Sequence, residues 1–331
     1  MDNITHSLTG ILLSRAGLDR FTPRAAWILF LAANAPDIDV VSALGGSLNY
    51  LHYHRNITHA LVAIPVLPVL CVLLVRLVSR KPLRWLGAYL IAVIGVASHV
   101  LLDLTNVYGV RLLLPFSGTW YHLDITQVID FWIWTALGLA FVAPLFVRLV
   151  NAEIGAGTQK RGGARRGFAI FALLVIAFYE GGRYFMHARA VNILDSRMYS
   201  GASPQRVAAF PELNLLRWRG VAETGELVNI DELDLLGQFD PGVGRTFYKP
   251  EPSPALETAR RSPVFQRFLE FSQYPFWELT PAETVEGATR VEAMDLRFGD
   301  PQSPGFVATA IIDSGQRVLR AWFQFGRVAP R

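Results

Sequence analysis

Four apolar runs in the first part of the chain are each long enough to cross a lipid bilayer as a helix. About 20 apolar residues suffice, because an α-helix rises about 1.5 Å per residue and the hydrocarbon core is about 30 Å thick. The runs cover residues 60–77, 83–104, 128–147 and 168–185. They constrain the chain to a polytopic transmembrane helical bundle.

Two shorter apolar segments precede these runs, at residues 4–13 and 23–35. Thr22 is suited to cap the second segment, and Pro23 is suited to its first helical position. Neither segment is long enough to span a membrane alone. We therefore expect two short helices that pack against the four full spans as a partly inserted hairpin.

The sequence changes character after about residue 187. Apolar residues dominate up to that point in a chain that is 52% hydrophobic and 18% charged, whereas the remainder mixes polar and aromatic residues. Alternation predicts strands at 216–221, 227–233, 290–297, 306–312 and 318–325, with a helix near 255–271. The expected fold class is mainly α, with a transmembrane bundle over residues 1–187 and a small extramembrane α+β domain over 188–331.

The distribution of Lys and Arg predicts the orientation of the bundle. Segments 15–24, 76–84 and 148–166 carry twelve cations, whereas 37–58 and 105–127 carry only Arg55 and Arg111. Positive loops stay cytoplasmic, so we expect a multi-pass plasma (inner) membrane protein whose C-terminal domain is extracytoplasmic. The cations form short clusters and not one long face, so the expected partner is the lipid bilayer and not nucleic acid.

Histidines and aspartates gather at the predicted outer ends of these helices. The single cysteine, Cys71, excludes a cysteine-based zinc site, so any metal must use imidazole and carboxylate ligands. Six of the seven histidines lie in the first 122 residues, near four aspartates: His6, His52, His54, His59, His99 and His122, with Asp37, Asp39, Asp103 and Asp124.

Two short patterns among them suit metal binding. His99 and Asp103 are four residues apart and share one helix face, as two ligands of one ion must. The alternative is a pair that only forms a hydrogen bond at a helix end. Asp37 and Asp39 follow Pro36, which ends a helix, and they either face a cation or lie in a loop exposed to water.

Other polar residues in these segments have less specific roles. Arg55 is the lone cation of its loop and suits an anionic phosphoryl oxygen. His52 fits an interfacial position better than ligation. His122 and Asp124 are candidates for a further ligand or for the support of one.

Taken in order, these motifs resemble those of a known family. The runs THSLTG, NAPDID, HRNITH and HVLLD, followed by NVYGVRLLLPFS, are similar to the YdjM family of membrane-bound metal-dependent hydrolases over about residues 1–150. Their order is also similar to that of the zinc-dependent phospholipase C and P1 nuclease superfamily. This resemblance implies metal ligands at five positions, with Asp103 as a bridge: His6, Asp37, His59, His99 and Asp103. A second His-x-x-x-Glu is missing, which favours one or two ions, zinc first, over three.

The residues and the resemblance together predict a metal-dependent hydrolase of a phosphoester in a lipid or lipid-linked substrate at the outer membrane face. The catalytic candidates are Asp39, as general base or as support for a ligand, Arg55, for the substrate phosphate, and His54. The alternative is a non-catalytic membrane scaffold with a structural metal site and an external domain that binds a partner.

Overall fold

The computed structural model describes residues 1–80, 82–153, 161–283 and 285–326. The chain divides into two compact units. Unit 1 contains residues 1–39 and 55–185, and unit 2 contains residues 40–54 and 186–331. Composition did not indicate that residues 40–54 group with the C-terminal part of the chain.

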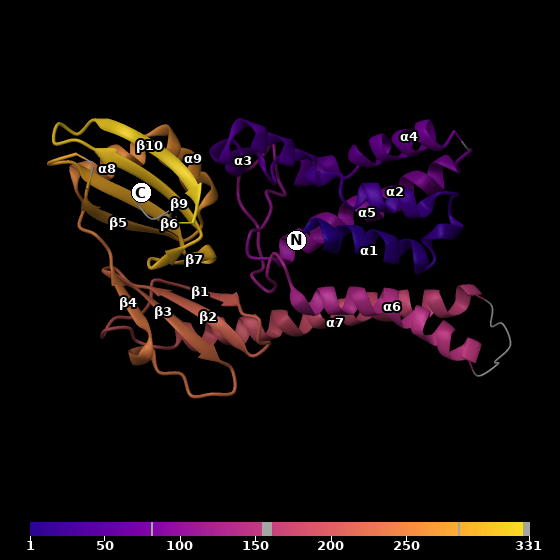
Figure 1. Cartoon of the computed structure of the whole chain (residues 1–331). Helices are drawn as coiled ribbons and strands as arrows, with labels where there is room; N and C mark the ends of the chain where they lie inside the picture. Colours follow the sequence, from indigo (N-terminus) through magenta and orange to yellow (C-terminus); the bar gives the residue numbers. More distant parts are fainter. Residues whose placement is uncertain (81, 154–160, 284, 327–331) are drawn as a thin grey trace. The chain divides into compact units, whose positions relative to one another are not determined.

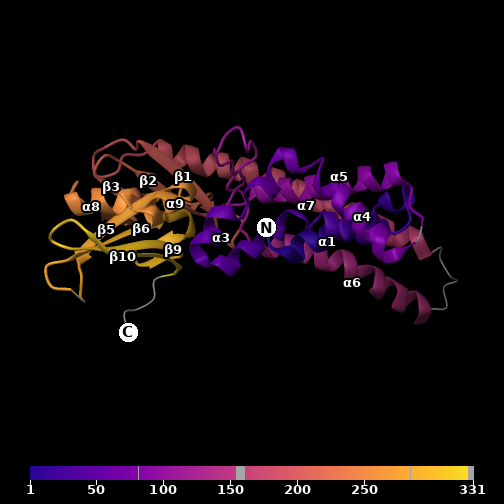
Figure 2. The same cartoon turned by 90° about the horizontal axis from the view of Figure 1, so that it is seen from above.

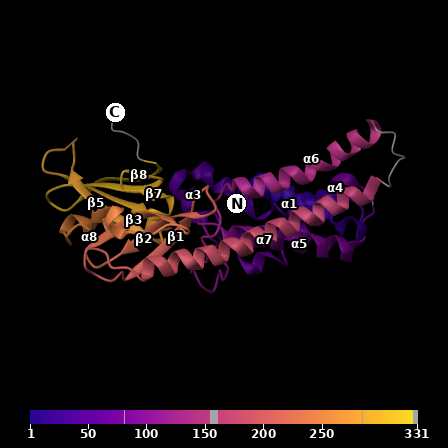
Figure 3. The same cartoon turned by 90° about the horizontal axis from the view of Figure 1, so that it is seen from below.

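Among the described residues, four helices that begin in unit 1 are long and apolar enough to cross a membrane, as expected from the four apolar runs. They cover Leu61–Ser79, Trp85–Thr105, Phe131–Glu153 and Arg165–Asp195. The corresponding elements are α4 (Leu67–Ser79, after a short 3-10 turn), α5 (Trp85–Thr105), α6 (Phe131–Glu153) and α7 (Arg161–Asp195). The last helix continues ten residues beyond the predicted apolar run, which ended at residue 185. Within unit 1 these helices run in a similar direction in all views (Figures 1, 2 and 3).

The two short N-terminal helices are also present, as α1 (Asn3–Arg15) and α2 (Ala25–Ala32). The expected start of α2 is wrong, because Arg24 adopts a left-handed conformation (φ 65°) and the helix begins only after it. The Thr22 hydroxyl instead accepts a hydrogen bond from the backbone N–H of Arg84 at 3.2 Å. After α2 the chain bends by 46° into a 3-10 segment, η2 (Pro36–Gly45).

Small residues allow α2 to approach α5 closely. A Cβ atom on Gly95 of α5 would lie 2.7 Å from the Cβ of Ala32, which is closer than two carbons can pack. Buried apolar residues from the two helices, among them Ile28, Leu29 and Ile91, fill the rest of the contact. This close packing brings the backbone of α2 next to the end of α5 that carries His99 and Asp103.

A second core joins the remaining helices of unit 1. It contains Leu12 of α1, Leu102 of α5, Ile133 and Leu137 of α6, and Ala169 of α7, all of them buried. Asp130 caps the start of α6, because its Oδ1 accepts hydrogen bonds from the N–H groups of Trp132 and Ile133 at 3.0 and 3.1 Å.

Unit 2 contains the expected α+β domain, built on two antiparallel four-stranded sheets. The first has the order β1-β2-β3-β4 and the second the order β10-β9-β6-β5. The strands of the first are Arg206–Pro211, Arg217–Glu223, Leu227–Asp234 and Arg245–Tyr248. In the second, β5 covers Pro275–Pro281, β6 Thr289–Asp295, β9 Phe306–Ile312 and β10 Val318–Phe325. Two short paired strands of two residues each, β7 (Gly299–Asp300) and β8 (Ser303–Pro304), lie between β6 and β9 in sequence.

Two helices of unit 2 occupy the region where one helix was expected. They are α8 (Pro254–Arg261) and α9 (Pro263–Phe271), and they are separate because Ser262 is extended and Pro263 starts a new first turn. The N-terminal segment of unit 2, residues 40–54, contains α3 (Ser47–Tyr53). Asn49 accepts a hydrogen bond from Arg267 of α9 at 3.1 Å, and Ser47 donates one to the Phe323 carbonyl of β10 at 2.9 Å. Residues 40–54 are thus held by α9 and β10.

The close approach at Gly95 leads to a first prediction. We expect Gly95→Leu to destabilise the bundle by about 1–3 kcal/mol, because a side chain there must push α2 away from α5. The thermal unfolding midpoint in detergent, followed by circular dichroism, measures the effect. Gly138→Leu on α6 is the matched control, since a Cβ there meets nothing within 4 Å. Equal midpoints for the two variants would contradict the prediction.

Candidate metal centre

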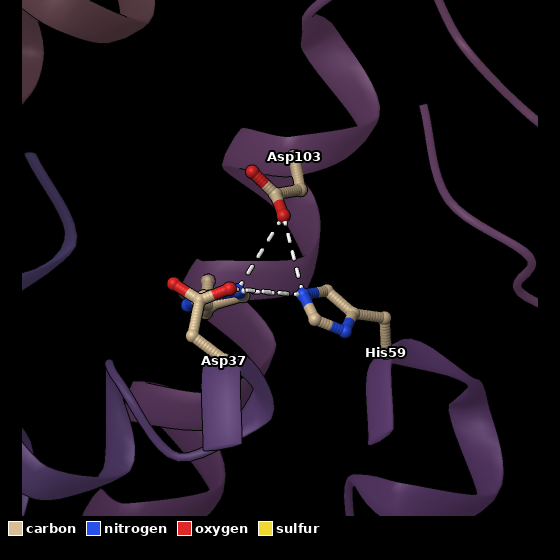
Figure 4. Close-up of side chains that lie close together, drawn as sticks. Asp37, His59 and Asp103 are labelled. Carbon is tan, nitrogen blue, oxygen red and sulfur yellow. Dashed lines mark hydrogen bonds and ion pairs between the residues drawn. The ribbon is translucent and has the colours of Figure 1, made fainter. Parts of the chain in front are cut away.

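Four ligand atoms from three separate segments meet inside unit 1. They belong to Asp37 of η2, His59 of the 3-10 turn η3 (Ile57–His59), and His99 and Asp103 of α5. His59, His99 and Asp103 are fully buried, and Asp37 is nearly so. Figure 4 shows Asp37, His59 and Asp103 pointing toward one another. The predicted pairing of His99 with Asp103 on one face of a helix is therefore part of a larger cluster.

Five of the six distances within the cluster are close to the edges of a coordination tetrahedron, and all four atoms lie within 4.8 Å of one another. His59 Nε2 lies 3.1 Å from His99 Nε2, 3.4 Å from Asp37 Oδ1 and 3.4 Å from Asp103 Oδ2. His99 Nε2 lies 3.6 Å from Asp37 Oδ1 and 3.4 Å from Asp103 Oδ2. Ligands about 2.0–2.2 Å from a tetrahedral zinc ion are separated from one another by about 3.3–3.6 Å. The four atoms thus fit around one small cation.

The hydrogen bonds of the two imidazoles determine which nitrogen can bind an ion. His99 Nδ1 lies 2.7 Å from the Ala33 carbonyl, which can only accept, so Nδ1 carries the proton and Nε2 presents a lone pair. His59 Nδ1 lies 3.2 Å from Asp39 Oδ2, a carboxylate that also only accepts. Both Nε2 atoms are therefore acceptors. Two nitrogen atoms that both present lone pairs, 3.1 Å apart and beside two carboxylates, require a shared cation or an added proton. A metal ion bound by all four groups meets this requirement.

Asp39 lies behind His59 and holds that ring. Its Oδ2 accepts hydrogen bonds from the Arg55 backbone N–H at 2.8 Å and from the Thr58 hydroxyl at 2.9 Å, in addition to its contact with His59 Nδ1. The 3-10 conformation after Pro36 directs Asp37 to one nitrogen of this imidazole and Asp39 to the other. This arrangement of carboxylate, histidine and ion is typical of protein metal sites.

Arg55 lies against the other oxygen of Asp103. Its guanidinium is 3.0 Å from Asp103 Oδ1 and donates hydrogen bonds of 3.1 Å to the Asn106 side chain and to the Gly109 carbonyl. It also lies over the ring of Tyr108, 4.6 Å from the centroid, and is buried. The Asn106 amide in turn donates to Asp103 Oδ1 at 3.2 Å. Arg55 therefore fixes the orientation of a ligand and supplies positive charge to a cluster rich in carboxylates.

His6 lies beside the four-atom group. Its ring stacks on that of His99 with centroids 3.7 Å apart, and its Nε2 is 3.4 Å from Asp103 Oδ1. The backbone amino nitrogen of Met1 contacts the same oxygen. The five residues implied by the family resemblance are thus neighbours, but His6 faces the Asp103 oxygen that Arg55 contacts, and the other four converge on a different point.

The remaining candidates have partners of their own. His54 belongs to unit 2, where its ring stacks on Tyr50 at 4.5 Å. His52, also in unit 2, lies 3.3 Å from Glu270. His122 Nδ1 and Asp124 Oδ2 form a pair at 2.8 Å.

Three contributors to the site were not predicted from the sequence: Thr58, the Ala33 carbonyl and Asn106. Asn106 follows Asp103 by three residues and ends α5, a spacing that places it within reach of the carboxylate. No side-chain pattern indicates a backbone carbonyl such as that of Ala33.

Fold and site together define a multi-pass membrane protein with a buried His/Asp cluster that can hold a metal ion. A family model described as YdjM inner membrane protein matches residues 1–189, more than half of the chain. The chain belongs to this family, as the motifs indicated, and it is an inner-membrane protein. A model described as the YfhP C-terminal alpha/beta plait domain matches residues 254–325.

Among curated proteins, the chain is similar to the uncharacterized protein YfhP of Bacillus subtilis (strain 168). The two are 25% identical over 322 residues, which cover 93% of this chain and 90% of the relative. No solved structure matches the chain significantly.

The position of Asp39 leads to a second prediction. We expect Asp39→Asn to weaken metal binding by about 10–100-fold without abolishing it, because the residue orients His59 but contributes no atom to the four. Metal retained after dialysis against graded chelator, measured by inductively coupled plasma mass spectrometry, tests this. Asp19→Asn, at an exposed position, removes a carboxylate elsewhere in unit 1 and serves as the control. Unchanged metal retention in Asp39→Asn would contradict the assignment.

Proposed function

We propose that the protein is a membrane-embedded, metal-dependent hydrolase that cleaves a phosphoester of a lipid or lipid-linked substrate at the outer membrane face. The observation that carries this proposal is the convergence of four buried ligand atoms within 4.8 Å of one another, with both imidazole lone pairs directed inward. A divalent ion bound there, zinc first among the candidates, would lower the pKa of a water molecule and polarise a phosphoryl oxygen.

The residues around the ligands have separate roles in this proposal. Asp39 keeps the proton of His59 on Nδ1, so that Nε2 stays available as a ligand. Arg55 and Asn106 hold Asp103 through its Oδ1 and leave Oδ2 directed at the cluster. Asp37 is the ligand nearest the protein surface, which makes its side of the cluster the approach for substrate. Arg55 thereby acts on substrate through Asp103 and the local charge.

The proposal of a lipid substrate rests on the residues next to the ligands in sequence. Ile38, beside Asp37, is 63% exposed, and Ile57 and Leu61, on either side of His59, are 46% and 49% exposed. Apolar side chains exposed in this way beside a buried polar cluster suit contact with acyl chains. A phosphoester at headgroup depth would then have its polar group near the ligands and its apolar chains along these side chains.

The outer location of the site depends on the orientation predicted from Lys and Arg. With Cys71→Ser as background, we expect a membrane-impermeant thiol reagent to label Thr119→Cys in intact cells but to label Arg80→Cys only after permeabilisation. Both positions are exposed, and they lie in loops of opposite predicted sides. Labelling of Arg80→Cys alone in intact cells would place the site on the cytoplasmic side.

Activity is tested with detergent-purified protein and a panel of phosphodiester, phosphomonoester and acyl-ester lipids. We expect metal-dependent hydrolysis of a phosphoester, reduced at least about 100-fold in His59→Ala and in Asp103→Asn, because each variant removes a ligand. Glu226→Gln, an exposed change in unit 2, is expected to keep full activity.

Two outcomes would overturn the proposal. Bound metal without hydrolysis of any ester in the panel would favour the scaffold with a structural metal site. Wild-type protein without stoichiometric metal would remove the basis of both functions.

A further inference from the structure

Two side chains on one strand of unit 2 each carry a buried oxygen atom without a donor. Asn229 and Asp231 lie two residues apart on β3, so their side chains share a face, and they are 4% and 3% exposed. Within the described ranges, neither Asn229 Oδ1 nor Asp231 Oδ2 has a hydrogen-bond partner. Buried polar atoms normally have partners, so this pair calls for an explanation.

The orientation of the Asn229 amide follows from its neighbours. Its Nδ2 donates to the Pro241 carbonyl at 3.3 Å and to the Thr246 hydroxyl at 3.2 Å. A backbone carbonyl can only accept, so the NH₂ group must face Pro241 and the oxygen must point away from it. Asn229 Oδ1 is therefore directed toward Asp231 as an acceptor.

Gly244 allows both side chains to lie close against its backbone. A Cβ atom on Gly244 would overlap Asp231 Oδ1 and lie 2.5 Å from Asn229 Oδ1. Both side chains therefore border one point above the backbone of Gly244, where any other residue would displace them. Asp231, Asp240 and Gly244 also line a cleft of about 860 Å³ within unit 2.

A second carboxylate lies near this point. Burial, and then the nearby carboxylate of Asp240, raise the pKa of Asp231 to about 7. Three arginines line the same cleft, and two of them, Arg219 and Arg245, are engaged with other groups. Arg245 pairs with Asp300 at 2.8 Å, and Arg219 donates to the carbonyls of Leu296 and Gly299, both at 2.8 Å.

We propose that Asp231, Asn229 and Asp240 form a binding site for a hard divalent cation, Ca²⁺ in particular, in unit 2. All the available ligands are oxygens, which Ca²⁺ and Mg²⁺ prefer over zinc. Two oxygens bound to one Ca²⁺ ion, at about 2.3–2.6 Å each, can be up to roughly 5 Å apart, which suits two side chains bordering one point. The open cleft leaves room for the water ligands that complete the coordination. This site uses none of the residues of the His/Asp cluster.

Calorimetric titration of the full-length, EDTA-treated protein with CaCl₂ in detergent tests the proposal. We expect one Ca²⁺ per chain and at least about tenfold weaker binding in Asp231→Asn, since each carboxylate ligand contributes strongly to affinity. Glu226→Gln removes an exposed carboxylate from the turn before β3 and is expected to bind Ca²⁺ as the wild type does. His59→Ala, which removes a ligand of the other cluster, is also expected to leave Ca²⁺ binding unchanged.

Asp240→Asn covers the case in which Asp231→Asn does not fold, because Asp240 is exposed and its change leaves the core of the sheet intact. Weaker Ca²⁺ binding in this variant, with an unchanged thermal midpoint in EDTA, supports the site. The absence of any binding heat in wild-type protein up to about 10 mM CaCl₂, well above the weakest protein sites, would show that water alone fills the space and would overturn the proposal. Equal affinity in wild type, Asp231→Asn and Asp240→Asn would overturn it as well.

Discussion

The hydrogen bond between His99 Nδ1 and the Ala33 carbonyl connects the packing of the bundle to the chemistry of its cluster. It forms because Gly95 and Ala32 allow α2 and α5 to approach closely, which brings the end of α2 within 2.7 Å of the imidazole. The bond fixes the proton on Nδ1 and so directs the Nε2 lone pair at His59 and the two carboxylates. Helix packing therefore determines the protonation pattern from which the metal site follows.

The helices and the proximity of His99 to Asp103 could be predicted because their signals are local. Hydropathy identifies the four spans, and the four-residue spacing of His99 and Asp103 places both on one helix face. The partners of Arg55 could not be predicted in this way. As the lone cation of its loop, Arg55 was predicted to contact an anionic phosphoryl oxygen of a substrate. In the structure its guanidinium contacts Asp103, Asn106 and a backbone carbonyl. Asn106 and Gly109 lie 51 and 54 residues away from Arg55 in sequence, and no sequence period connects them.

No sequence pattern predicts that residues 40–54 group with unit 2, because hydrogen bonds of single polar side chains hold the segment there. Ser47 and Asn49 contact residues more than 200 positions away. This segment is joined through the backbone to residues of the His/Asp cluster's surroundings. The segment begins directly after Asp39 and ends directly before Arg55. Both residues that orient ligands of the cluster are thus covalently joined to a segment that packs within unit 2.

Both candidate ion sites lie where acceptor atoms lack a hydrogen-bond donor. The type of acceptor atom distinguishes the two sites. In unit 1 the acceptors that face one another include two imidazole nitrogens, which favour zinc or a similar transition metal. In unit 2 the buried oxygens without a donor belong to a carboxylate and an amide, which favour Ca²⁺. In both places such acceptors need a proton, a water molecule or a cation. Because the two sets of ligands select different ions, the two sites can be loaded and tested independently in one protein.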